Sequence, residues 1–106
     1  MAGPYVAGSL IRVSSYGGTI AFPTDGYRDI NGNLIDPASV ILTYIDGQGT
    51  RHTVTYPTAP IIKDGTGLYH ADLDTTSLAG SWSYEWSSTG TGQAAKIGTF
   101  IVTAGL

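Results

Sequence analysis

Large apolar and polar residues alternate along residues 68–73 and again along residues 81–87, and a glycine precedes each stretch. Because successive side chains of a strand point to opposite faces, this alternation is typical of half-buried antiparallel strands. Residues 40–46 are almost continuously apolar, which favours a place in the middle of a sheet. The pattern therefore predicts an all-β fold and points to no particular reaction.

Turn-forming residues divide the rest of the chain into further short strands. We expect strands at residues 9–15, 40–46, 50–56, 61–63, 68–73, 81–87 and 95–102, and we expect residues 19–22 to continue or bend the first one after Gly17 and Gly18. Prolines flank residues 61–63, which favours the edge of a sheet. Seven or eight strands in 106 residues predict a single antiparallel β-sandwich.

The same alternation predicts the core. Its main members are the large residues on the inward faces of the last strands, namely Tyr69, Trp82, Tyr84, Trp86 and Phe100, extended by Ala71, Leu73 and Val102. Burial of each aromatic side chain removes about 150 to 250 Å² from water. Hydrophobic residues make up 42% of the chain and charged residues only 12%, so one core is expected and helices should be few or absent.

We expect residues 9–106 to form one domain and residues 1–8 to form a flexible amino-terminal arm. Within this arm, Pro4, Tyr5 and Val6 are candidates for contact with a partner. Residues 23–36 form the longest irregular stretch and are expected to be loosely held. The chain shows neither a secretory signal pattern nor an apolar run of membrane-spanning length, so we expect neither export by such a signal nor insertion.

The charge pattern argues against nucleic acid and anionic membranes as partners. The formal net charge is −3, and the five basic residues are scattered: Arg12, Arg28, Arg51, Lys63 and Lys96. Binding to a polyanion requires several basic residues to neutralise phosphates together. The chain has no cysteine, which excludes a disulfide framework, a thiolate metal site and a cysteine nucleophile.

Few residues suggest catalysis, and we expect the protein not to be an enzyme. His52 and His70 both lie in expected strands, and neither stands in a recognisable nucleophile motif. Asp72 shares a face with His70 and could orient its imidazole, but two polar residues on the solvated side of a strand explain the pattern more simply. Asp74 and Glu85 lie near Asp72 in sequence without an evident cleft, and no cofactor motif is present.

One stretch carries oxygen ligands at calcium-like spacing. Asp29, Asn31, Asn33 and Asp36 follow one another at short intervals, with Asp25 just before them. The glycine is misplaced relative to a helix-loop-helix calcium motif, and the distal glutamate is missing. A turn stabilised by Asn and Asp side chains explains the same residues.

The aromatic strand also permits a carbohydrate-binding role. If Trp82, Tyr84 and Trp86 faced solvent, they would form a flat platform for sugar rings. The opposite face carries Ser81, Ser83, Glu85 and Ser87, which suit water, so patterning favours the aromatic residues as core. A carbohydrate-binding module therefore stays as the alternative of another class.

Residues 64–71, with the sequence Asp-Gly-Thr-Gly-Leu-Tyr-His-Ala, resemble the Asp-x-Gly-x-Tyr-x-Cys signature of immunoglobulin-like domains, shifted by one residue at the Asp. The resemblance implies an immunoglobulin-like sandwich in which Tyr69 forms a tyrosine corner, with its hydroxyl bonded to upstream backbone. Ala71 stands at the cysteine position, so the inter-sheet disulfide of that family is absent.

A second resemblance covers about the whole chain. In the order of its elements the chain is similar to small immunoglobulin-like proteins of tailed bacteriophage virions. That order is a strand ending at Phe22, a loop with Asn31-Gly32, an apolar strand after Asp36-Pro37, and the stretches 67–72, 80–86 and 98–102. This resemblance implies a virion structural protein that assembles in the host cytoplasm. The expected role is capsid decoration, with the major capsid protein and copies of itself as partners; the alternative is a head-tail or tail accessory protein.

Overall fold

The computed structural model describes residues 5–6, 10–76, 78–89 and 96–103, and for residues 5–6 it describes the backbone only. These residues form ten strands and no helix: β1 (Tyr5–Val6), β2 (Leu10–Ser14), β3 (Tyr16–Gly18), β4 (Pro23–Asp25), β5 (Ser39–Ile45), β6 (Arg51–Thr55), β7 (Ile61–Gly65), β8 (Leu68–Asp74), β9 (Gly80–Thr89) and β10 (Lys96–Thr103). The all-β expectation is confirmed, although the strands outnumber the seven or eight expected. The described part contains no helix that could cross a membrane.

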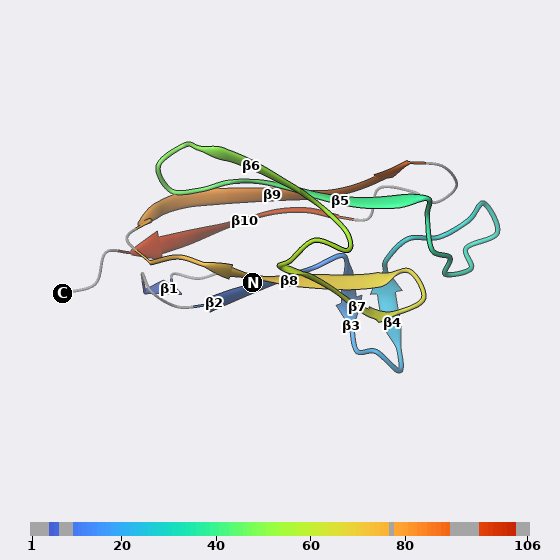
Figure 1. Ribbon diagram of the computed structural model, residues 1–106. Helices are drawn as coiled ribbons and strands as arrows, with labels where there is room; N and C mark the ends of the chain where they lie inside the picture. The colour runs from blue at the N-terminus through green and yellow to red at the C-terminus, as the bar shows by residue number, and fades with distance from the viewer. Residues whose placement is uncertain (1–4, 7–9, 77, 90–95, 104–106) are drawn as a thin grey trace.

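The strands form two main sheets that lie face to face (Figure 1). The larger sheet, sheet A, has the order β1-β10-β9-β5-β6, and the smaller one, sheet B, has the order β2-β8-β7. Strands β3 and β4 form a separate hairpin that projects from the side of sheet B facing away from sheet A (Figure 1). Apart from the parallel pair β1 and β10, the strand pairs are antiparallel, as in a β-sandwich.

Two strand positions confirm what the sequence pattern predicts. The apolar strand β5 lies between β9 and β6 inside sheet A, so both of its edges are hydrogen bonded. The proline-flanked strand β7 lies at the edge of sheet B. A continuous apolar run thus predicts the position of β5 in the middle of its sheet, and flanking prolines predict the position of β7 at an edge.

Residues 19–22 were expected to continue or bend the first strand, and they do not continue it. The chain reverses there, so that Tyr16 pairs with Asp25 and Gly18 pairs with Pro23. The Thr19 hydroxyl accepts a hydrogen bond of 3.0 Å from the Phe22 amide and fastens the turn. Gly18 has a φ of 68°, which residues with a Cβ rarely adopt. Glycine at this position therefore permits the reversal.

The core between the sheets contains the aromatic residues predicted from alternation. Trp82 is 2% exposed and Trp86 is 0% exposed, and Tyr69 and Phe100 are also buried. Tyr84 is only half-buried and packs at the margin of this cluster. Replacement of a core tryptophan by alanine costs about 3 to 5 kcal/mol, so the two indoles account for a large part of the stability of a small domain.

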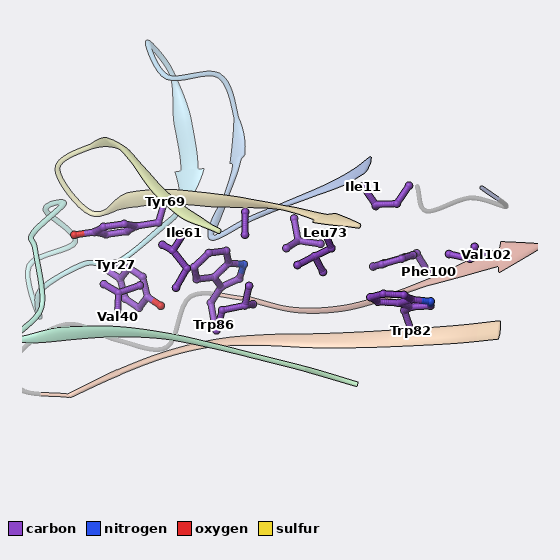
Figure 2. Packing of buried hydrophobic residues seen from close by; sticks show 13 residues of the cluster. Ile11, Tyr27, Val40, Ile61, Tyr69, Leu73, Trp82, Trp86, Phe100 and Val102 are labelled. Atoms are coloured by element: carbon purple, nitrogen blue, oxygen red, sulfur yellow. The ribbon is translucent and has the colours of Figure 1, made fainter. Parts of the chain in front are cut away.

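Four rings stack in series at one end of the core. Phe100 lies 5.5 Å from Trp82 between centroids, Trp82 lies 6.0 Å from Tyr44, and Tyr44 lies 4.7 Å from His52. Neighbouring planes differ by 22° or less. Figure 2 shows the Trp82 and Phe100 rings facing each other at this end, with Trp86 farther along the core. The series leads from the buried core to the half-exposed His52.

Residues 23–36 were expected to be loosely held, and this is wrong for residues 26–36, which close the other end of the sandwich (Figure 1). Tyr27 is 0% exposed and lies near Tyr69 in the core (Figure 2). Its hydroxyl donates to the Ser87 carbonyl, and its amide donates to the Gly67 carbonyl. Tyr27 thereby connects the 26–36 segment to β9 of sheet A and to the β7–β8 turn of sheet B.

The expected amino-terminal arm is described only at two residues. Tyr5 and Val6 pair in parallel with Val102 and Thr103 at the edge of sheet A. Pro4 and the rest of residues 1–8 lie outside the described residues. The backbone of Tyr5 and Val6 is therefore part of sheet A.

Candidate functional site

The two histidines occupy equivalent positions in a repeated hairpin motif. Residues 46–52 and 64–70 both read Asp-Gly-x-Gly-x-x-His. In each hairpin the aspartate and the histidine, six positions apart, meet through their side chains. Sequence reasoning missed this pair of motifs, although the shared spacing was visible in the sequence.

The first motif joins β5 to β6. One oxygen of Asp46 accepts hydrogen bonds from the amides of Gln48 and Thr50, at 2.8 and 3.1 Å. The other oxygen lies 2.8 Å from Nε2 of His52. The bond to His52 and the two amide bonds outweigh burial and lower the pKa of Asp46. This carboxylate therefore organises the turn.

The second motif joins β7 to β8 on the outer face of sheet B. Nδ1 of His70 lies 2.8 Å from Asp64, and the Tyr16 hydroxyl donates to the same carboxylate at 2.7 Å. Burial and the bond to Asp64 raise the pKa of Tyr16 to about 12. His70 is 6% exposed, so the expectation that it lies on a solvated face is wrong. The β3–β4 hairpin, which supplies Tyr16, contributes to covering this face.

The surroundings of His70 do not form a catalytic triad. Its Nε2 atom is buried without a hydrogen-bond partner and lies 4.0 Å from Asp72. Asp72 is engaged by Arg12 through two hydrogen bonds of 3.0 and 3.3 Å, which lower the pKa of Asp72. Within the described residues, neither histidine has a serine or threonine hydroxyl as a hydrogen-bond partner. The arrangement suits a structural role, because the nucleophile of a triad must contact its base.

The calcium candidates are engaged by protein donors. Asp29 accepts hydrogen bonds from the amides of Asn31 and Asn33, at 2.9 and 3.0 Å. Asp36 is likewise turned toward Lys63, whose Nζ lies 2.7 Å away. Among the described residues no group of three or more His, Asp or Glu side chains could hold a metal. The geometry matches the alternative of a turn fixed by Asp and Asn side chains.

Tyr69 does not form the expected tyrosine corner. Its hydroxyl donates to the carboxylate of Asp36 at 3.1 Å, whereas the corner requires a bond to upstream backbone. The same oxygen of Asp36 accepts the Gly67 amide at 2.8 Å. Asp36 therefore links the 26–36 segment to the β7–β8 turn.

The solvent-facing aromatic platform does not form. Trp82 and Trp86 both point into the core, and Nε1 of Trp82 donates to the Leu78 carbonyl at 2.8 Å. The outward positions of β9 are polar, as patterning favours. The carbohydrate alternative thereby loses the surface on which it depended.

Two surface features of the described residues are candidate contacts. The first, which we term the knob, consists of Ile20, Ala21 and Phe22 at the tip of the β3–β4 hairpin; Phe22 is 82% exposed and Ile20 is 60% exposed. The second, which we term the cavity, is a hollow of about 180 Å³ on sheet A. Its lining comes from four strands and comprises Thr43, Tyr44, Ile45, Arg51, Ser83, Tyr84, Glu85 and Ile97.

Comparison with known proteins identifies no relative. No family model, curated protein or solved structure matches this chain.

Proposed function

We propose that this protein is a non-enzymatic virion structural protein built on an immunoglobulin-like sandwich, and that it decorates the outer surface of a phage capsid. The whole-chain resemblance to small virion proteins motivates the virion setting. The fold and the distribution of exposed apolar residues support a binding role. Its proposed partners are the major capsid protein and further copies of the chain.

The strand order supports the immunoglobulin-like part of the proposal. If β2, β5, β6, β7, β8, β9 and β10 are lettered B, C, C′, D, E, F and G, sheet B reads B-E-D and sheet A contains G-F-C-C′. Immunoglobulin domains divide their strands between two sheets in the same way, and the variable type adds strands beside C. Packing of Trp82 and Trp86 would replace the missing disulfide.

The observation that carries the binding role is the display of large apolar side chains on both outer sides of the sandwich. Phe22 and Ile20 project from the side of sheet B, and Ile97 and Ile101 lie on β10 with 73% and 54% exposure. Exposed apolar side chains that lie together mark sites of protein association, whereas single ones are common on any surface. A component of a shell needs contacts on more than one side.

The proposal is tested by asking whether the protein copurifies with assembled particles, and in what number. Binding to the shell in hundreds of copies per particle supports capsid decoration. Binding in a few copies transfers the role to the neck or tail. Purified particles that lack the protein, and that do not bind it when it is added back, contradict the virion role.

A further inference from the structure

We propose that the knob of one copy inserts into the cavity of a second copy, so that the chains associate head to tail. The knob is Ile20, Ala21 and Phe22, and the cavity lies on the outer face of sheet A. This contact deepens the proposed function, on which it rests for its biological setting, by naming the surfaces used between copies.

The knob is held in a fixed shape before any partner arrives. Phe22 donates its amide to the Thr19 hydroxyl at 3.0 Å. The Arg28 guanidinium donates to the carbonyls of Asp25 and Gly32, each at 2.7 Å, and to that of Pro23 at 3.3 Å. At the base of the hairpin, the Tyr16 hydroxyl is bonded to Asp64. An anchor that is ordered in advance loses less entropy on binding, which favours association.

The cavity has the size and lining for one aromatic side chain. Its volume is about 180 Å³, and a cavity of about 150 Å³ in a protein accommodates benzene. Ile45 and Ile97 supply apolar contacts, and Thr43 and Ser83 supply hydroxyl groups. Phe22 of a second copy would therefore find both room and apolar surface.

The charges of the cavity match the electrostatics of a phenyl ring. Arg51 and Glu85 both line it, and neither side chain has a hydrogen bond or ion pair with another described residue. A guanidinium is attracted to the negative face of an aromatic ring, and a carboxylate is attracted to its positive edge. By contrast, Arg12 and Asp72 on sheet B already pair with each other. Arg51 and Glu85, which have no such partner in the described part of the chain, are thus available to the incoming ring.

The positions of the two features determine the symmetry. The hairpin that carries the knob projects from the side of sheet B facing away from sheet A (Figure 1). The cavity is lined by residues of sheet A strands, so it lies on the other sheet of the sandwich. A contact between two different surfaces is heterologous, and it continues from copy to copy unless the rotation closes a ring. A two-fold dimer formed by one shared surface is therefore not expected.

The test uses two variants that disable opposite halves of the contact. Phe22→Glu removes the anchor, and Ser83→Trp fills the cavity. Phe22 is exposed and Ser83 is half-buried, and thermal melting verifies that each variant folds. Sedimentation of the wild-type protein should show mass rising with concentration, with a Kd of about 10 µM to 1 mM for so small an interface. Each variant alone should associate at least about tenfold more weakly, because a buried aromatic anchor dominates such contacts.

An equimolar mixture of the two variants gives the decisive result. The knob of Ser83→Trp is intact and fits the open cavity of Phe22→Glu, so the mixture should form a 1:1 complex and nothing larger. Leu10→Glu, at an exposed apolar position on β2, is the matched control and should associate like wild type. A wild-type protein that stays monomeric at about 1 mM, variants that associate like wild type, or a mixture without a complex would each overturn the contact.

Particle binding separates this inference from the proposed function. Protein that copurifies with particles but never self-associates disproves the knob contact and leaves the virion role standing. Protein that self-associates as described but does not bind particles disproves the virion role alone.

Discussion

The two Asp-Gly-x-Gly-x-x-His hairpins share a local design and differ in what packs against them. In the 46–52 hairpin the His52 side chain is 39% exposed, and its ring stacks on Tyr44. In the 64–70 hairpin the His70 side chain is 7% exposed, and its aspartate also binds Tyr16. The motif thus determines the aspartate–histidine contact, whereas neighbouring segments determine its burial.

Substitution of the motif glycines can measure how differently the surrounding segments pack on the two hairpins. Gly49 and Gly67 occupy the same motif position with φ values of 84° and 71°. A Cβ at Gly49 would meet nothing within 4 Å, but at Gly67 it would lie 2.7 Å from the Tyr27 carbonyl oxygen and 2.8 Å from that of Ile35. The 26–36 segment therefore packs on Gly67, whereas no described segment packs on Gly49 in this way.

The largest expected effect is that of Gly67→Ala. Positive φ costs a residue with a Cβ about 1 to 2 kcal/mol, and the overlap with backbone adds about 1 to 3 kcal/mol, so we expect a loss of about 3 kcal/mol or more. Gly49→Ala carries only the conformational cost of about 1 to 2 kcal/mol. Urea denaturation of both variants measures the difference; equal losses would show that the 26–36 segment does not press on this turn.

At the first glycines of the motifs, Gly47 and Gly65, the order of the two hairpins is reversed. A Cβ at Gly47 would lie 2.4 and 2.5 Å from the carbonyl oxygens of Ala79 and Leu78, whereas at Gly65 its nearest neighbour is a Leu68 methyl group at 3.6 Å. We expect Gly47→Ala to cost about 1 to 3 kcal/mol and Gly65→Ala to cost less than about 0.5 kcal/mol. Thermal melting ranks the two, and a more harmful Gly65→Ala would contradict the packing described here.

Tyr16→Phe tests how much the bond from Tyr16 to Asp64 stabilises the buried 64–70 hairpin. Loss of the hydroxyl removes its bond to Asp64 and should cost about 1 kcal/mol. In an Asp64→Asn background the same substitution should cost much less, since the charged acceptor is gone. A double-mutant cycle measures this coupling, and strictly additive losses would argue that the bond contributes nothing to stability.

The smallest effect concerns pH and the more exposed hairpin. The bond to His52 lowers the pKa of Asp46 in the folded protein. The stabilisation by this bond is therefore present above the pKa of an unfolded aspartate, about 3.9, and is lost as the pH falls below that value. His52→Gln should therefore weaken the decline of stability on acidification from pH 5 to pH 2. Urea midpoints at several pH values provide the measurement, and parallel curves for variant and wild type would contradict this link.

Alternation along the chain was sufficient to predict the all-β fold and the burial of Trp82, Trp86 and Phe100, because strand geometry alone separates the two faces. It misplaced His70, because period two assigns a face but does not reveal that a distant hairpin covers it. Residues 19–22 were expected to continue or bend the first strand, and Gly18 and the bond from Phe22 to Thr19 make them a turn.

The candidate contact surfaces were harder to predict. The cavity needs residues from β5, β6, β9 and β10, which come together only through the order of strands in sheet A. The prominence of Phe22 depends on the hairpin that carries it, and a lone phenylalanine in sequence predicts burial. The aspartate–histidine motif was different, since its repeated spacing was readable without any structure.

The series of stacked rings from Phe100 to His52 gives the molecule an optical signature. Trp82 lies between two nearly parallel neighbours, Phe100 and Tyr44, so its electronic transitions couple to theirs in a fixed, chiral arrangement. Near-ultraviolet circular dichroism should therefore contain a band that depends on the alignment of β5, β9 and β10. That band would report the integrity of sheet A in solution without any attached dye.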